Sequence, residues 1–201
     1  MSIENQEEKF SYSIGLSLAS NMLQSGIKSI NLEKVYEAIG DVMNGQQPKI
    51  SPQEANQVIE EFFKNKQATE GAENAKAGEE FLSLNRKSKD IVELESGLQY
   101  KILNAGEGDK PQATDKVKCH YHGTLIDGSV FDSSVQRNQP AEFPVNGVIK
   151  GWVEALQMMP TGSKWRLFVP PHLAYGDQGA GGVIGPKATL IFDVELLEII
   201  K

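Results

Sequence analysis

Uneven spacing of the prolines constrains the fold of this 201-residue chain more than any other sequence feature. Pro48 and Pro52 lie close together, the next proline is Pro111, and the remaining six all follow in the C-terminal half. Because proline interrupts helices, the proline-free span favours a long helix. Its start is marked by Ser51 as a cap, Pro52 in the first turn and Glu54 three residues after the cap. The sequence therefore predicts a long helix that begins at Ser51-Pro52.

The predicted long helix changes character along its length. Its first part carries an apolar stripe at spacings of three and four residues, made of Val58, Ile59, Phe62 and Phe63. From Ala68 to Glu80 the stripe fades into Ala, Glu, Lys and Gly. We therefore expect this second part to lie in solvent.

Two shorter amphipathic helices are predicted before it. The first carries an apolar residue at every fourth position and ends near Gly26, with Phe10, Ile14, Leu18 and Met22. The second is capped by Asn31 and ends before Gly45, with Leu32, Val35, Tyr36, Ile39 and Met43. The N-terminal region that holds these two helices is too short to bury so much apolar surface by itself. We expect this region to form a homodimer; the alternative is that its helices fold back on the C-terminal domain.

After Ser96-Gly97 the sequence changes to short β-rich runs separated by Gly and Pro. The runs cover residues 98–103, 116–125, 163–169 and 188–199. The last run places Leu190, Phe192, Val194 and Leu196 on one face, as expected for a half-buried antiparallel strand. A short helix, Val148 to Met158, interrupts the strands. The predicted class is α+β: an N-terminal helical region, then an antiparallel sheet wrapped round a short helix.

Composition and charge exclude several classes of function. The net charge is −7 and no block of Lys and Arg occurs, so nucleic acid is not an expected partner. The single Cys119 excludes an intrachain disulfide framework. The first ten residues show no signal peptide, and no apolar run reaches the roughly 20 residues of a membrane span. We expect a cytoplasmic protein without a membrane partner; removal of a leader would make a periplasmic or surface location the alternative.

Covalent and metal chemistry find little support in the sequence. His120 and His122 alternate to the strand face opposite Cys119, which disfavours a Cys/His nucleophile pair. The two histidines share a face, but no Cys, Asp or Glu at ligand spacing completes a metal site. The glycine-rich run 176–185 lacks the Lys-Ser/Thr of a phosphate loop and leads into a strand. It is interpreted as a hairpin tip, and neither a metal nor a cofactor is predicted.

The remaining candidates indicate a shallow apolar pocket. Its floor and walls would be formed by Tyr121, Phe131, Val148, Ile149, Trp152, Tyr175 and Phe192. Asp132 and the hydroxyls of Tyr121 and Tyr175 would orient a ligand. The apolar Val183 and Ile184 lie on the predicted hairpin tip, where they would wall a pocket or meet a partner. Each residue taken alone is also typical of a core or a turn.

Five stretches, taken together in order and spacing, resemble the FK506-binding-protein family of peptidyl-prolyl cis-trans isomerases over roughly residues 96–201. They are His120-Tyr121-His122-Gly123, Gly128-Ser129-Val130-Phe131-Asp132-Ser133-Ser134, Val148-Ile149-Lys150-Gly151-Trp152, Leu173-Ala174-Tyr175-Gly176 and Ala188-Thr189-Leu190-Ile191-Phe192-Asp193-Val194-Glu195-Leu196. The helical part resembles the bacterial branch typified by the macrophage infectivity potentiator and its cytoplasmic relatives, notably in residues 11–15. The resemblance implies a dimerisation region at 1–50, a connecting helix at 51–95 and an isomerase domain at 96–201.

The resemblance also implies residue roles. The catalytic pocket would contain Tyr121, Phe131, Asp132, Trp152, Tyr175 and Phe192. Substrate-binding residues would be Val148, Ile149, Arg137, Phe143, Val183 and Ile184. In this pattern Trp152 lies under the prolyl ring, Arg137 pairs with Asp132, and the Tyr175 hydroxyl and Ile149 amide bond substrate carbonyls.

The sequence departs from the family pattern at three positions. Ala141 replaces an aromatic residue, with Phe143 two residues later, and the tip has Ala180 and Gly185 where His and Pro are frequent. The expected function remains X-Pro isomerisation of unfolded or partly folded polypeptides, with chaperone-like binding by the dimer and inhibition by macrolides of the FK506 type. A non-catalytic binding scaffold of the same fold is the alternative.

Overall fold

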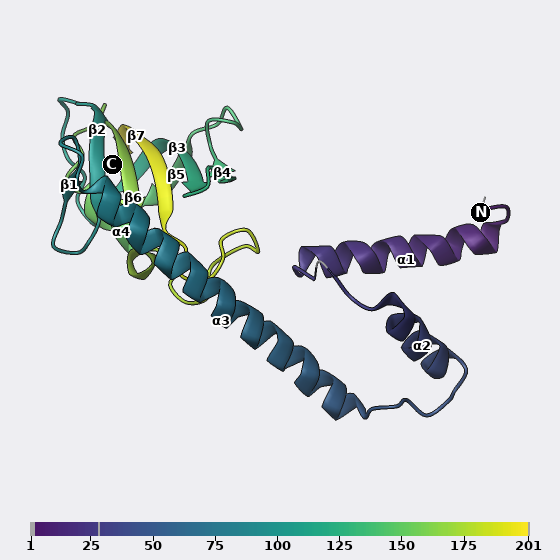
Figure 1. The fold of residues 1–201 in the computed structure, drawn as a ribbon. Coiled ribbons are helices and arrows are strands. Elements are labelled where there is room, and N and C mark those ends of the chain that lie inside the picture. Colours follow the sequence, from purple (N-terminus) through teal and green to yellow (C-terminus); the bar gives the residue numbers. More distant parts are fainter. Residues whose placement is uncertain (1–2, 28, 201) are drawn as a thin grey trace. The chain divides into compact units, whose positions relative to one another are not determined.

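The computed structural model describes residues 3–27 and 29–200 and divides into two compact units, Met1–Lys64 and Asn65–Lys201. Figure 1 shows helices in the first unit, and a sheet with one short α-helix and most of a long helix in the second. The predicted α+β class is confirmed. One long helix, α3 (Pro52–Asn85), contributes its first turns to one unit and the rest to the other. None of the helices in the described residues is long and apolar enough to cross a membrane.

Side-chain caps start the helices of the first unit. In α1 (Gln6–Gln24), Asn5 accepts a hydrogen bond from the Glu8 amide at 2.8 Å. In α2 (Leu32–Met43), Asn31 accepts one from the Lys34 amide at 3.1 Å. The Ser51 hydroxyl accepts one from the amide of Glu54 at 3.1 Å where α3 begins. These bonds satisfy backbone donors that a helix start leaves unpaired, and they confirm the starts predicted at Asn31 and Ser51.

The apolar stripes of α1 and α2 are exposed in the single chain. Among the described residues of these two helices none is buried. Phe10 is 67% exposed, Tyr36 82% and Met43 81%. Both predicted helices are therefore present, and their described apolar side chains are exposed within the first unit.

The second unit contains an antiparallel sheet in the order β1-β2-β6-β7-β3-β4, with β5 also paired to β3. Its strands are β1 (Val92–Glu93), β2 (Gln99–Asn104), β3 (Lys116–Leu125), β4 (Val130–Ser133), β5 (Ala141–Pro144), β6 (Lys164–Val169) and β7 (Leu190–Ile200). The two longest strands, β3 and β7, pair along their whole length. On its other edge β3 pairs with β5 near its start and with β4 near its end.

One face of the sheet packs on α4 (Lys150–Leu156), which follows the 3-10 turn η1 (Val145–Gly147). Trp152, Ala155 and Leu156 of α4 belong to the same core as the inward residues of β7. In β7, buried residues alternate with half-buried ones, starting from Leu190. The predicted helix and the predicted alternation are both present. Strands β4 and β5 were not predicted, because each has only four residues and contains or adjoins turn-forming Asp, Ser or Pro.

The prediction that residues 68–80 lie in solvent is wrong for one face of α3. Gly71 and Gly78 are buried, and an ideal Cβ on Gly78 would lie 2.3 Å from Thr189 Oγ1. Farther along, the rings of Phe81 and Phe168 are 5.8 Å apart. The faded stripe is a close-packing surface built from glycine, which carries no apolar signal. The helix itself ends at Asn85, before β1.

Candidate active site

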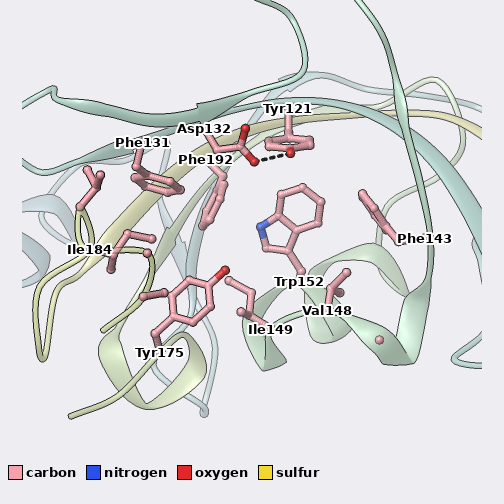
Figure 2. A pocket seen from close by; sticks show the side chains of 14 residues that line it. Tyr121, Phe131, Asp132, Phe143, Val148, Ile149, Trp152, Tyr175, Ile184 and Phe192 are labelled. Carbon is pink, nitrogen blue, oxygen red and sulfur yellow. Dashed lines mark hydrogen bonds between the residues drawn. The ribbon is translucent and has the colours of Figure 1, made fainter. Parts of the chain in front are cut away.

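A cavity of about 620 Å³ opens between α4, β3, β4, η1 and the loop that precedes β7 (Figure 2). It is lined by Tyr121, Phe131, Asp132, Phe143, Gly147, Val148, Ile149, Trp152, Tyr175, Ala180, Gly181, Val183, Ile184 and Phe192. Every residue predicted for the site lines it except Arg137, which contacts two of the lining residues. Gly147, Ala180 and Gly181 also line it and were not predicted as site residues, since small side chains carry no signal of a binding role.

Trp152 forms the floor of the cavity, near the start of α4, and is only 4% exposed. Three aromatic rings meet it in edge-on geometry: Tyr121 at 5.5 Å, Phe143 at 5.4 Å and Phe192 at 5.2 Å between centroids. Phe131 meets Phe192 in the same way at 5.4 Å. Edge-on aromatic contacts fix the orientation of each ring. The floor is therefore rigid and apolar, and it is ready to accept a flat apolar group.

A glycine allows the aromatic wall to pack closely. Gly123 lies on β3, and an ideal Cβ there would lie 2.6 Å from the ring of Phe131 and 3.0 Å from the ring of Phe192. No side chain fits at these distances. This explains physically why the stretch that carries Tyr121 continues with glycine.

A hydrogen-bonded triad forms the polar edge of the cavity. The Tyr121 hydroxyl donates to Asp132 Oδ2 at 2.5 Å, and the Arg137 guanidinium donates to Asp132 Oδ1 and, at 2.9 Å, to the Tyr121 hydroxyl oxygen. Arg137 also lies over the Tyr121 ring, with 5.8 Å from Cζ to the centroid. The arrangement fixes Asp132 as an acceptor at the cavity edge.

The contacts within the triad shift the pKa values of all three members away from neutrality, and the hydrogen bonds to Asp132 and Tyr121 raise the pKa of Arg137. Burial opposes ionisation of Asp132, but hydrogen bonds from Tyr121 and Arg137 outweigh it and lower the pKa of the carboxyl. Burial, followed by the hydrogen bond to Asp132, raises the pKa of Tyr121. Asp132 is therefore ionised and Tyr121 neutral throughout the physiological range.

Tyr175 and Ile149 lie across the cavity from Asp132 (Figure 2). Tyr175 follows the 3-10 turn η2 (Pro171–Leu173) and is 42% exposed. Ile149 precedes the first residue of α4 and accepts hydrogen bonds through its carbonyl from Trp152 and Val153. The remaining wall comes from the loop before β7, where Ile184 is 8% exposed and Val183 is 54% exposed. Each predicted site residue on these segments thus borders the same cavity.

The two histidines of β3 have hydrogen-bond partners, and the cysteine of this strand is buried. His120 Nδ1 lies 3.1 Å from the Ser134 hydroxyl, and His122 Nδ1 lies 2.9 Å from that of Ser133. Cys119 is buried, and burial raises the pKa of its thiol to about 12, which leaves no thiolate for nucleophilic attack. Within residues 3–27 and 29–200 no cluster of three or more His, Cys, Asp and Glu could hold a metal ion.

Comparisons with known proteins agree with this geometry. Residues 107–197 match the family described as FKBP-type peptidyl-prolyl cis-trans isomerase, and residues 7–102 match the domain amino terminal to it. The FKBP-type 22 kDa peptidyl-prolyl cis-trans isomerase of Escherichia coli is 45% identical over 96% of both chains. Outer membrane protein MIP of Legionella longbeachae is 45% identical over 100% of this chain and 88% of its own. The crystal structure of FkpA from Escherichia coli has a TM-score of 0.71 and 34% identity, and covers 98% of both chains.

Proposed function

Since this chain belongs to the FKBP-type peptidyl-prolyl cis-trans isomerases, we propose that the cavity above Trp152 binds the prolyl ring of the substrate and accelerates rotation of the X-Pro bond. The observation that carries this proposal is the open cavity of about 620 Å³ with an aromatic floor and with Asp132 at one edge. A pyrrolidine ring is a compact apolar group that fits such a floor.

The chemistry requires no nucleophile and no proton transfer. Rotation about the X-Pro bond is slow because it breaks amide resonance, a barrier of about 18–20 kcal/mol. The twisted amide has less charge separation than the planar amide. A pocket that removes water therefore favours the twisted form over the planar ground state. Each tenfold gain in rate requires about 1.4 kcal/mol of such preference.

The polar groups orient the peptide around the buried ring. The Tyr175 hydroxyl and the Ile149 amide would donate to substrate carbonyls, which lie on either side of the rotating bond. Asp132, held ionised by Tyr121 and Arg137, places a fixed negative charge at the opposite edge. Because these groups act by orientation and polarity, no single substitution should abolish turnover as loss of a nucleophile does.

A non-catalytic scaffold of the same fold is the rival proposal, and an isomerisation assay separates the two. A protease-coupled or NMR-exchange assay on an X-Pro peptide would compare wild type with Tyr175→Ala and Asp132→Ala. We expect catalysis in wild type and a loss of about 10-fold to 100-fold in kcat/KM in both variants. Asp90→Ala, on an exposed aspartate paired with Lys101, is the matched control. A wild-type protein without catalysis would establish the scaffold.

We also propose that the first unit forms a homodimer. The exposed apolar residues of α1 and α2 support this, because such faces on a soluble chain mark an interaction surface. The match of residues 7–102 to an amino-terminal domain found before such isomerases is consistent with a separate role for this region. Sedimentation velocity over a range of concentrations tests it, and a concentration-independent monomer would contradict it.

Chaperone-like binding follows from two pockets in one dimer, because the second contact with an unfolded chain becomes intramolecular. For a test we would remove residues 1–64, which leaves the second unit with the part of α3 that belongs to it. We expect the shortened protein to turn over a short X-Pro peptide nearly as fast as the full chain. Refolding of a proline-limited protein should become slower. Equal losses in both assays would refute this division of labour.

Macrolides of the FK506 type are proposed inhibitors because their binding would occupy the same aromatic floor. Titration of the isomerase assay with such a macrolide tests this, and undiminished turnover at saturation would contradict it.

A second location must be considered beside the predicted cytoplasmic one, since one relative carries the name of an outer membrane protein. We propose the cell envelope as the alternative location; fractionation of cells decides between them.

A further inference from the structure

The loop before β7 forms one wall of the cavity and is internally well defined. We call residues 176–187 the tip loop. Its base is closed by a hydrogen bond from the Lys187 amide to the Gly176 carbonyl at 2.8 Å. Its tip is closed by two bonds that join Ala180 and Ile184, at 2.8 and 3.0 Å. The tip-loop residues that line the cavity are Ala180 and Ile184, which form the tip closure, and Gly181 and Val183, which lie inside it.

The back of the tip loop rests on α3. Asn74 Nδ2 donates a hydrogen bond of 2.9 Å to the Pro186 carbonyl. An ideal Cβ on Gly185 would lie 2.9 Å from the same Asn74 nitrogen and 2.4 Å from Glu70 Oε1. An ideal Cβ on Gly71 would lie 3.5 Å from the ring of Pro186. We call residues 184–187 the returning arm of the tip loop. This arm packs against α3 through one glycine of each partner, Gly185 of the loop and Gly71 of the helix, and Asn74 donates a hydrogen bond to it.

We propose that Asn74 is a positioning residue for the substrate pocket. Through the Pro186 carbonyl it fixes the returning arm of the tip loop, and Ile184 in the cavity wall lies two residues away on that arm. The consequence is that α3 determines how tightly the pocket binds the peptide beside the prolyl ring. This inference rests on the proposed function and adds a residue outside the cavity to it.

The glycine content of the tip loop is the physical reason why an outside anchor is needed. Gly176, Gly179, Gly181 and Gly182 all have positive φ, which shows how far this backbone departs from ordinary conformations. Such a segment has wide conformational freedom when nothing fixes it. A loose wall would have to be ordered each time a peptide binds, and that cost lowers affinity. The floor at Trp152 would keep its geometry, so the rotation step itself would change little.

The first test uses full-length Asn74→Ala and an X-Pro peptide. We expect KM to rise by about threefold to tenfold, as the loss of one hydrogen bond predicts, while kcat stays within about twofold. Asn65→Ala is the matched control: the same substitution on the same helix, at an exposed position. A residue that only stabilised the fold would lower the melting temperature without this split between KM and kcat.

The second test approaches the same contact from the loop. Gly185→Ala should displace Glu70 and Asn74 and raise KM to a similar degree. Because both variants disrupt the same contact between α3 and the tip loop, the KM of the double variant should be little higher than that of either single variant. Amide hydrogen exchange at Ile184 should be faster in both variants than in the Asn65→Ala control.

The outcomes separate the two levels of proposal. A wild-type chain that does not catalyse isomerisation refutes the proposed function. A catalytically active wild type in which Asn74→Ala and Gly185→Ala both keep the KM of the Asn65→Ala control refutes the positioning role of Asn74. Additive effects in the double variant would also overturn it, because they would assign the two residues to independent contacts.

Discussion

Two helical surfaces of this chain contradict what hydropathy alone would predict: an apolar surface on α1 is exposed, and a surface on α3 without large apolar residues is buried. On α1 the apolar stripe that includes Phe10 and Ile14 is exposed. On the second part of α3, where no apolar stripe exists, Gly71 and Gly78 are buried against the isomerase domain. An apolar pattern thus indicates that a surface needs a partner without naming the partner. A glycine pattern can mark a contact that no hydropathy measure detects.

The two surfaces differ because they are stabilised in different ways. Removal of apolar area from water scales with side-chain size, so it leaves a strong sequence signal. Close backbone approach depends on the absence of a side chain, so its signal is a small residue at helical spacing. In α3 this spacing joins Gly71, Asn74 and Gly78, which lie on one face over two turns.

The largest expected effect concerns the apolar stripe. The double variant Ile14→Glu with Leu18→Glu should raise the dissociation constant of the proposed dimer by about a hundredfold or more, because unpaired charges would be buried at the interface. Sedimentation velocity measures it. The control, Ser13→Glu with Ser20→Glu, adds the same charge to α1 at two positions outside the stripe of Phe10, Ile14, Leu18 and Met22. If both pairs shift association equally, α1 does not associate through its apolar stripe.

The glycine surface gives the next effect. Gly78→Ala should destabilise the second unit by about 1–3 kcal/mol, since its Cβ would lie 2.3 Å from Thr189 Oγ1 and 3.2 Å from Thr189 Cβ. Chemical denaturation followed by tryptophan fluorescence measures it, because both tryptophans lie in that unit. Unchanged stability would mean that α3 does not need close approach at this position.

Gly71→Ala sharpens the same comparison with a smaller effect of opposite sign. Its Cβ would find Pro186 at 3.5 Å, an ordinary van der Waals contact. Alanine also favours the helix over glycine by about 0.5–1 kcal/mol. We expect a neutral to slightly higher midpoint in the same denaturation experiment. Destabilisation as large as that of Gly78→Ala would show that the whole face, rather than one position, excludes side chains.

The smallest effect is a pH dependence. The pKa of Asp132 is lowered in the folded protein, so its contribution to stability is present above the unfolded pKa and is lost as pH falls through the folded value. The pKa of Tyr121 is raised, so its contribution is lost only as pH rises through that value. We therefore expect kcat/KM to be flat between about pH 5 and 9. A bell-shaped profile centred near neutrality would indicate acid–base catalysis instead.

Much of this architecture could be predicted from the sequence because the signals are local. Caps at Asn31 and Ser51 fix helix starts, and alternation fixes the inward face of β7. Roles could be assigned to most of the cavity residues only because five stretches agreed with a family pattern, since an aromatic such as Phe131 is, taken alone, equally typical of a core. The contact of Asn74 with Pro186 could not be predicted, because it joins residues far apart in sequence.

The central claim is that the cavity above Trp152 binds proline, and the chain contains a built-in control for it. It has two tryptophans, Trp152 and Trp165, and both indole nitrogens are buried without a hydrogen-bond partner among the described residues. Trp165 instead stacks on Tyr100 with 4.3 Å between ring centroids. Titration with an X-Pro peptide, followed through the two indole N–H signals by NMR, should shift the Trp152 signal and leave the Trp165 signal in place. A shift of Trp165 alone, or of neither, would contradict the account.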